Sequence, residues 1–247
     1  MLQSISSYKS SKIIFFTLLL CFSSSLYAAT TKLPQINVLG NGVEDLNTIP
    51  GSAALISESS IKQTQPFSTN ELLRKVSGVS VREEEGMGLR PNISIRGIYG
   101  NRSQKVLLLE DGIPIALAPY GAPDAYYSPQ VNRIQSIEVL KGSGSILYGP
   151  QTIAGVINYQ TFQPSKTASF YNKTGLGNND EFIQQVRYSN TFGKTGVVVE
   201  ALNKQGNGPR DPMPFKIYDF SGKLVQQLDD VSDLSVKLHL NPKENPY

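Results

Sequence analysis

Side chains that could form a catalytic set are scarce in this chain of 247 residues, which has one histidine, His239, and one cysteine, Cys21. His239 lies in a segment that alternates apolar and polar residues, where we expect it to face a lumen or solvent rather than act as a base. Without it no Ser/His/Asp or Cys/His set can be assembled, and no residues have the spacing of a metal site. Gly142-Ser143-Gly144 matches neither a phosphate-binding loop nor a complete dinucleotide-binding motif. We therefore expect no enzyme, no resident metal and no cofactor.

The first 29 residues have the pattern of a secretory signal. Lys9 and Lys12 form a positive region, Ile13–Phe22 an apolar core, and small residues follow, with cleavage expected after Ala28 or Ala29. The apolar run is shorter than the roughly 20 residues that a spanning helix needs. The sequence thus predicts an exported protein that loses Cys21 with its signal and has no disulfide.

Composition limits the partners and the fold class. The net charge of +3 becomes +1 when the two signal lysines are removed (3 − 2 = 1), so nothing indicates a nucleic-acid partner. With 21 Gly, 15 Pro, 12 Tyr and no Trp, the composition suits a turn-rich β-protein. The size allows one or two domains.

Residues 48–164 predict one small mixed domain. Ala53–Ser57 is expected to be a strand, and Ser68-Thr69-Asn70-Glu71 has the spacing of a capping box that starts a helix ending before Gly78. The segment 92–97 predicts a strand with Ile93 and Ile95 on one face and Arg96 on the other. Val106–Leu109 is a further strand, and Asp111-Gly112 after it is a strong turn signal.

The segment Arg133–Asn158 is rich in glycine and bounded by apolar strands. Ile137 and Val139 alternate on the first strand, and Val156–Tyr159 forms the second. Four glycines lie between or beside them, as expected where the backbone turns tightly or passes close to other backbone. Alone, this pattern also fits an ordinary glycine-rich hairpin.

From about residue 165 the pattern changes to long strands with unlike faces. Phe182–Thr191 and Thr195–Asn203 are joined by Phe192-Gly193-Lys194, and Leu234–Leu240 alternates strictly. Alternation over about 10 residues is typical of a transmembrane barrel strand, although a soluble sheet fits these segments equally well.

In their order along the chain, these motifs resemble the plug domain of TonB-dependent outer-membrane receptors. The matching pieces are the segment NELLRKVSGVSV, Ile95-Arg96-Gly97, the run from Val106 through Asp111-Gly112-Ile113-Pro114, and the glycine-rich segment after Arg133. The resemblance implies an α+β plug domain, a small mixed β-sheet with short helices, over 48–164. The first antiparallel strands of an incomplete transmembrane β-barrel would follow over 165–247, with Lys204–Pro214 in an outer loop. Plugged barrels have about 22 strands, so a complete receptor would be far longer.

The resemblance also implies an energy-coupling segment in the arm 30–47. Leu33, Pro34, Gln35, Ile36, Asn37 and Val38 occupy the place of the TonB box, a strand that pairs with the sheet edge of the inner-membrane-anchored protein TonB. A disordered arm or an edge strand is the alternative reading of the same residues.

Two cations correspond to the family's lock between plug and barrel. The motif arginines of the plug pair with glutamates of the barrel wall; Arg96 matches the first, and Lys141 stands where the second arginine is usual. Lysine keeps the charge but loses bidentate geometry. The alternative is that both are ordinary surface charges.

The ligand would contact loops at the plug apex. The residues that the resemblance assigns to this site are Asn101, Arg102, Lys105, Tyr120 and Asp124. The loop containing Tyr120, together with Asp111-Gly112-Ile113-Pro114 and Tyr148-Gly149-Pro150-Gln151, is most similar to the ferric-dicitrate branch, but Ala122 replaces the usual Gln and Asp124 adds a negative charge. Two cations and an aromatic ring suit an anionic ferric complex such as ferric citrate.

We therefore expect an outer-membrane receptor that imports a metal chelate, with TonB, the chelate and outer-membrane lipid as partners and iron present only within the ligand. Receptors of this family for another siderophore, haem or cobalamin remain alternatives. A passive porin or adhesin of the outer membrane is a candidate from another class, which would need neither plug nor TonB box.

Overall fold

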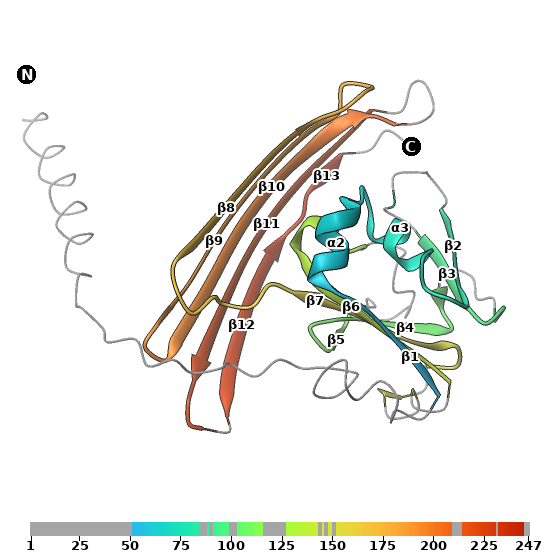
Figure 1. Ribbon diagram of the computed structural model, residues 1–247, viewed down its shortest axis with the longest axis horizontal. Helices are drawn as coiled ribbons and strands as arrows, with labels where there is room; N and C mark the ends of the chain where they lie inside the picture. The colour runs from blue at the N-terminus through green and yellow to red at the C-terminus, as the bar shows by residue number, and fades with distance from the viewer. Residues whose placement is uncertain are drawn as a thin grey trace, which may run out of the picture.

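A computed structural model describes residues 51–83, 88, 91–98, 103–115, 127–142, 145, 148–149, 152–208, 214–230 and 232–244. The predicted signal and the arm Leu33–Val38 lie outside these residues. The described chain has two parts (Figure 1): a mixed domain with strands β1–β7 and the short helices, and a long sheet, the wall, made of β8–β12. The mixed domain lies against one face of the wall. None of the helices in the described segments is long and apolar enough to cross a membrane.

The mixed domain is built on a five-stranded sheet of order β1-β6-β7-β4-β5. Its strands are β1 (Ser52–Ile56), β4 (Val106–Glu110), β5 (Ile113–Pro114), β6 (Ile134–Lys141) and β7 (Gly155–Thr161), and β4 runs parallel to β7 while the other pairs are antiparallel. Strands β2 (Val79–Glu83) and β3 (Pro91–Ile95) form a separate pair on the side away from the wall. The α+β prediction is confirmed.

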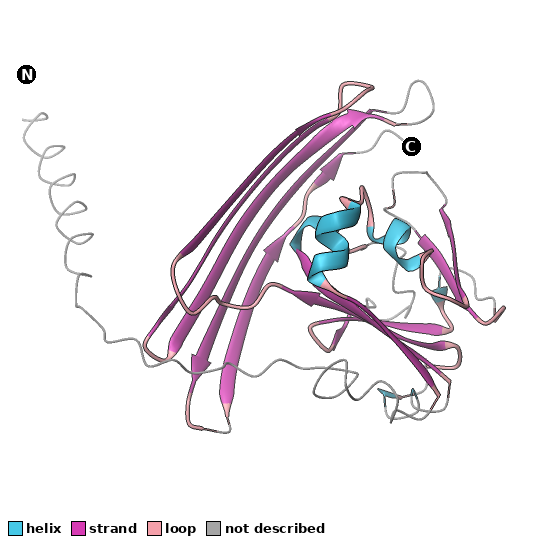
Figure 2. Ribbon diagram, in the orientation of Figure 1, coloured by secondary structure: helices cyan, strands magenta, loops and turns pink. Residues whose placement is uncertain are grey.

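Two short α-helices, α2 (Glu58–Thr64) and α3 (Thr69–Leu73), precede β2 (Figure 2). Helix α2, which the sequence analysis did not predict, begins at Ser57, whose hydroxyl accepts a hydrogen bond from the amide of Ser60. At α3 the capping box does not form as predicted. Ser68 makes no side-chain cap, and Glu71 accepts instead from the amide of Phe67, the residue before the N-cap, at 3.1 Å.

Apolar side chains from the sheet, α3 and the β2–β3 pair form one core. Its fully buried members include Leu72, Leu73, Ile93, Ile95, Ile137, Val139 and Ile157. The expected alternation of Ile137 and Val139 therefore fills the core, and the glycine-rich segment joins the paired strands β6 and β7 as expected. Gly155 is required at the start of β7, because a Cβ there would lie 2.4 Å from the carbonyl oxygen of Leu140.

The Asp111-Gly112 turn forms the β4–β5 hairpin. Asp111 and Gly112 have φ angles of 51° and 79°, so both are left-handed, as a type I′ turn requires. Arg96 differs from the expectation. It does not lie on a strand face but in the turn after β3, at φ 52°, because β3 ends at Ile95 where the chain reverses.

The wall is an antiparallel sheet of order β12-β11-β10-β9-β8. Its strands are β8 (Ser169–Leu176), β9 (Phe182–Phe192), β10 (Thr195–Asn207), β11 (Pro214–Gln227) and β12 (Asp233–Leu240), and the two-residue strand β13 (Lys243–Glu244) pairs with β11. The expected outer loop at Lys204–Pro214 is shorter than predicted. Pairing of β10 with β11 continues to Asn207 and Pro214, so Lys204 belongs to a strand.

The two faces of the wall differ strongly in polarity. On the face away from the mixed domain, Leu234, Val236, Leu238 and Leu240 of β12 are 53–57 % exposed. The opposite face contains buried Gln185, Glu200, Lys204, Asp219 and Lys223. This arrangement is the apolar-out, polar-in pattern of barrel strands, and it confirms the fold predicted for the second part of the chain.

Candidate functional site: the interface between the mixed domain and the wall

The hairpin turn between β4 and β5 contacts two lysines of the wall. Lys237 on β12 contacts Glu110 and lies 2.9 Å from Oδ2 of Asp111, and Lys223 on β11 lies 3.0 Å from the same oxygen. Asp111 also accepts hydrogen bonds from the amide and the hydroxyl of Thr161, at 2.8 and 2.6 Å. The turn thus links the end of β7 to two neighbouring wall strands.

A buried arginine connects the same turn to the wall. Arg133, in the 3-10 helix η3 (Val131–Arg133), binds both carboxylate oxygens of Glu110, at 2.9 and 2.5 Å. Its Nε lies 3.7 Å from Oδ2 of Asp219 on β11, and Nε2 of His239 lies 2.9 Å from that oxygen. Arg133 is 2 % exposed, so these opposite charges are what make its burial tolerable.

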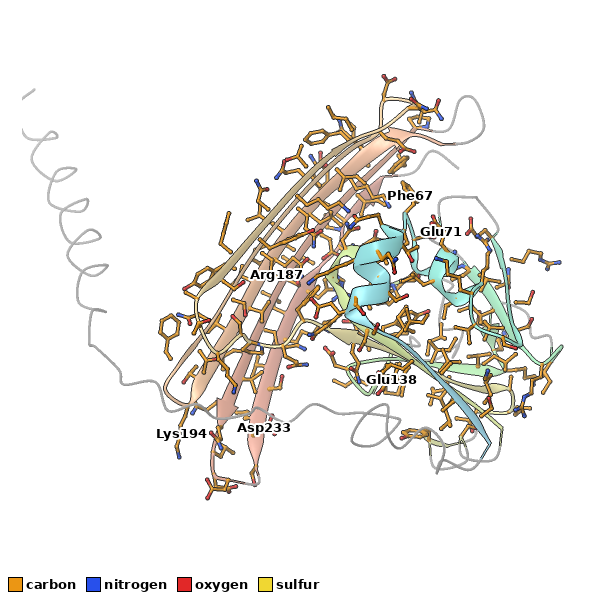
Figure 3. The ribbon with its side chains drawn as sticks, in the orientation of Figure 1. Phe67, Glu71, Glu138, Arg187, Lys194 and Asp233 are labelled. Atoms are coloured by element: carbon orange, nitrogen blue, oxygen red, sulfur yellow. The ribbon has the colours of Figure 1, made fainter. Side chains whose placement is uncertain are left out.

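A third contact holds the segment between α2 and α3. Lys204, 2 % exposed on β10, donates a hydrogen bond of 2.6 Å to the carbonyl of Phe67 and lies 3.1 Å from the centroid of its ring. Phe67 packs edge-on against Phe215 of β11, with centroids 5.9 Å apart. Figure 3 shows Phe67 where the helices meet the wall and Glu71 nearby at α3.

The charges on the inner face of the wall alternate in sign along the strands. Near one end of the wall, Lys204 of β10 lies opposite Ile217 of β11. Asp219 is two residues further along β11, and Glu200 of β10 lies opposite the next inward position, Ser221. Lys223, two residues beyond Ser221, lies opposite Lys237 of β12. The wall is therefore positive, then negative, then positive from one end to the other. The mixed domain presents the complementary groups in the same order: the Phe67 carbonyl, Arg133, and the Glu110–Asp111 turn. A shift along the strands would bring like charges together, so this pattern fixes the register of the two parts.

The two turn carboxylates are strongly biased toward the charged form. Burial alone would raise the pKa of Glu110, but Arg133 and Lys237 outweigh it and hold that pKa below its usual value. Burial likewise acts to raise the pKa of Asp111, and Lys223 and Lys237 bring it well below the usual range. Both side chains are therefore ionised at neutral pH.

The side of the mixed domain that faces β8 and β9 also contacts the wall. Gln185 of β9 donates to the carbonyl of Asn132 at 2.7 Å and contacts Glu200. Beside this contact, a small cavity of about 50 Å³ lies between α2 and the strands. Arg187 at its edge lies 3.2 Å from the centroid of Phe162 and 4.9 Å from that of Tyr171. The cavity has room for one or two waters and not for a metal chelate.

The family model described as the TonB-dependent receptor plug domain matches residues 45–156. This range covers nearly all of the mixed domain described above. We therefore call the mixed domain the plug, after the family model that it resembles. The chain is also 33% identical over 157 residues to the vitamin B12 transporter BtuB of Vibrio vulnificus, and 32% identical over 153 residues to BtuB of Vibrio cholerae. These matches cover 63% and 62% of this chain but 25% and 24% of the relatives, so the chain corresponds to about a quarter of their length.

Solved receptor structures share the fold of both parts. The ferric citrate transporter FecA in its unliganded form superposes with a TM-score of 0.72 at 23% identity, over 87% of this chain and 34% of FecA. The siderophore receptor PirA from Acinetobacter baumannii superposes with a TM-score of 0.61 at 19% identity, over 83% of this chain and 33% of the PirA chain. In keeping with the expectation that the chain is no enzyme, the family and these relatives are receptors and transporters.

The predicted lock residues lie together, at the far side of the plug. Nζ of Lys141 donates to the carbonyl of Ser77 at 2.8 Å, and a Cβ on neighbouring Gly142 would lie 3.1 Å from the Arg96 guanidinium. Burial first, and then the positive charge of Arg96, lower the pKa of Lys141. The buried acids of the wall strands, Glu200 and Asp219, contact other groups. Pairing of Arg96 and Lys141 with barrel glutamates therefore stays a prediction.

Of the predicted ligand residues, Lys105 is described and Asn101, Arg102, Tyr120 and Asp124 lie outside the described part. Lys105 directly precedes β4, and its carbonyl accepts from the amide of Ala154 at 2.8 Å. Glu110, at the other end of β4, contacts the wall. Lys105 therefore lies at the end of β4 that points away from β11 and β12. Its role in ligand binding stays a prediction. No cluster of three or more metal-binding side chains occurs in the part of the chain that the structure describes.

The sequence analysis missed the residues that join plug and wall: Glu110, Asp111, Arg133, Phe67, Lys204, Asp219, Lys223 and Lys237. A signal for some of them was present. Lys237 lies on the polar face of the strictly alternating segment Leu234–Leu240, and Asp111 lies in a motif whose turn was predicted. Alternation indicates which side chains face inward, but it does not indicate which of them meet.

Proposed function

We propose that the protein is a TonB-dependent receptor of the outer membrane that imports a metal chelate. The observation that carries this proposal is a plug domain held by complementary charges against the polar face of a sheet whose other face is apolar. Such an arrangement suits a barrel that the plug closes and that must be opened by an external source of energy. We propose TonB as that source, acting through Leu33–Val38.

For the ligand, we propose an anionic ferric complex such as ferric citrate, with iron present only as part of the ligand. Arg102, Lys105 and Tyr120, in loops that resemble the ferric-dicitrate branch, support it. The likeness to FecA supports the fold and not the ligand, because the identity is 23%.

Cobalamin is the second candidate, and a specific observation favours it. Two relatives that match this chain at 32–33% identity, over 153–157 residues, are named vitamin B12 transporters. Most ligand contacts of such a receptor would come from barrel loops outside this chain, so the match to the plug leaves both ligands open to test.

Uptake by cells that make the complete receptor tests both the receptor assignment and the proposed ligand. Cells would receive ⁵⁵Fe-dicitrate or labelled cyanocobalamin, in strains with and without TonB. We expect uptake of ferric dicitrate that disappears without TonB. Uptake of cyanocobalamin alone, if it also requires TonB, would identify cobalamin as the ligand in place of ferric citrate and would support the receptor assignment. TonB-independent entry of both would favour a passive porin instead.

A further inference from the structure

Two buried polar side chains meet on the face of the plug sheet that is turned away from the main core. Glu138 of β6 and Asn158 of β7 lie opposite each other in the ladder, and both are buried. Their strand neighbours, such as Ile137 and Val139, point into the core on the other face. Figure 3 labels Glu138 on the side of the sheet away from α2. Nδ2 of Asn158 donates a hydrogen bond of 2.9 Å to Oε2 of Glu138, and burial makes the loss of such a bond costly.

The other end of the Asn158 carboxamide holds the hairpin turn between β4 and β5. Its Oδ1 accepts a hydrogen bond of 2.9 Å from the backbone amide of Gly112. The backbone amide of Asp111 donates to the carbonyl of Tyr159 at 2.9 Å, and the Asp111 carboxylate accepts from Thr161. Three positions of β7 thus fix the turn that contacts the wall lysines, and the side chain of Asn158 links this turn onward to β6.

The same row of the sheet extends to β1. Leu55 of β1 lies opposite Glu138, and Asn158 lies opposite Leu109 of β4, the strand that runs into the turn. Leu55 also packs against the buried apolar cluster of this face, which includes Leu109. Strand β1 is the outermost strand of its sheet and the first described strand after the proposed TonB-binding segment Leu33–Val38. The row therefore connects the strand that a pull on the arm would reach first with the turn that contacts the wall.

The start of β1 lies in close contact with the end of β6. Gly51, directly before β1, has a φ angle of 106°, and a Cβ there would lie 2.5 Å from the carbonyl oxygen of Lys141. A side chain at this position must therefore move the start of β1 away from β6, because the atom that it meets belongs to the backbone. A substitution of Gly51 thus displaces β1 without changing the row of Glu138 and Asn158.

We propose that Glu138 and Asn158 are positioning residues, which make the contact of the turn with the wall lysines depend on β1. When β1 leaves β6, water reaches Glu138 and competes for its carboxylate, so Asn158 loses its fixed partner and Gly112 its fixed acceptor. The Asp111 carboxylate then no longer stays aligned with the wall. We call this connection the Glu138–Asn158 link. It rests on the proposed function, and it goes beyond it by naming the residues through which a pull on the arm would release the plug from the wall.

Hydrogen exchange of the Gly112 amide in the purified complete receptor tests the link, because this amide donates to Asn158. In the otherwise wild-type protein, Gly51→Val should raise the exchange rate about tenfold, since displaced β1 no longer protects Glu138. In a Glu138→Leu background the same change should add no more than about twofold, because the connection from β1 is already broken. Independent, additive effects of the two changes in this double-mutant cycle would overturn the link.

Two further backgrounds separate positioning from general loss of packing. Glu138→Gln keeps a side-chain oxygen that accepts from Asn158, so Gly51→Val should again raise the exchange of the Gly112 amide about tenfold. Asn158→Ala takes the place of Glu138→Leu in the cycle if that variant does not fold, with the same expectation of no more than about twofold. Loss of the response in Glu138→Gln, or a full response in Asn158→Ala, would overturn the link.

Ser136→Ala is the matched control. The hydroxyl of Ser136 donates to the side-chain oxygen of Gln160 at 2.7 Å, between the same two strands and on the same face, two residues from Glu138. Removing this bond should leave the response of Gly112 exchange to Gly51→Val unchanged. If Ser136→Ala abolishes the response as Glu138→Leu does, any loss of a β6–β7 contact has this effect, and the specific role of Glu138 is contradicted.

Uptake separates the link from the proposed function. Cells that make the complete receptor would receive ⁵⁵Fe-dicitrate and labelled cyanocobalamin in separate assays. Glu138→Leu should lower the maximal rate of TonB-dependent uptake about tenfold and leave equilibrium binding of the imported ligand unchanged, and Glu138→Gln should transport like the wild type. Equal maximal rates in Glu138→Leu and wild type would overturn the link and leave the receptor assignment. A wild type that imports neither ligand would contradict the proposed function, and the exchange experiment would still decide whether the link exists.

Discussion

The ammonium group of Lys237 lies 2.9 Å from a carboxylate oxygen of Asp111, across 126 positions of sequence. Asp111 forms the tight turn between β4 and β5, and Lys237 is on β12, so this contact joins the plug to the fourth strand after β8. The same carboxylate also contacts Lys223. One aspartate thus contacts two lysines of the wall, and Glu110 beside it supplies a second negative charge to Lys237.

Replacing Asp111 by Asn should loosen the plug. The change keeps the shape of the side chain but leaves two lysines with less compensation, for which we expect a cost of about 3 kcal/mol in the stability of the plug–wall contact. Limited proteolysis and thermal unfolding of the purified receptor measure it. Asp230→Asn, in an exposed turn, serves as control. If both variants resist protease equally, the Asp111 contact is not a determinant of plug retention.

The contribution of Glu110 and Asp111 should depend on pH only in acid. Both folded-state pKa values lie below the ordinary values of 4.5 and 3.8, so their stabilisation is complete above those values and is lost as the pH falls through the depressed ones. The difference in unfolding free energy between wild type and Asp111→Asn should be constant from about pH 5 to 8 and shrink below about pH 4. A difference that already declines between pH 8 and 6 would contradict this assignment.

Replacing Lys204 by Met should release the segment between α2 and α3. The methionine retains most of the stem but removes the donor to the Phe67 carbonyl and the cation above its ring. Together these interactions are worth about 2 kcal/mol, or about 30-fold in local opening. Hydrogen exchange of residues 66–73 reports this opening directly. Lys194→Met, in the β9–β10 turn, should leave the exchange unchanged.

Replacing Ile36 by Pro in the complete receptor should abolish uptake and leave ligand binding intact. Proline removes a backbone donor that strand pairing with TonB needs. Transport of the bound ligand and its equilibrium binding would be measured separately, with Ile36→Val as a control that keeps the donor. Normal transport by Ile36→Pro would remove the assignment of Leu33–Val38 to TonB binding.

Removing the two cations Arg102 and Lys105 should weaken binding of ferric dicitrate, by about tenfold at low salt and by less at high salt, because ions screen exposed charges. Isothermal titration of the double glutamine variant at two ionic strengths measures the change. Tyr120→Ala should weaken binding at both salt concentrations, through lost contact area. No loss in the double variant would exclude these cations from the site and would leave the receptor assignment untouched.

Local patterns in the sequence determined much of the architecture. The period-2 alternation of Leu234–Leu240, the Asp111-Gly112 turn and the apolar strands around the glycine-rich segment depend on neighbours along the chain, and each appears in the structure as expected. Helix α2 was missed because all its side chains remain partly exposed, so it has no apolar stripe to detect.

The pairing of plug and wall was decided by tertiary structure alone. Arg96 and Lys141 lie in recognisable motifs, whereas Arg133 and Lys204 lie in ordinary sequence surroundings and are buried where the wall packs against the plug. A buried charge selects its partner by distance and desolvation, and both depend on where segments more than a hundred residues apart meet. Sequence periodicity therefore determined which face of each strand is polar, and only the packing of plug against wall determined which opposite charges meet there.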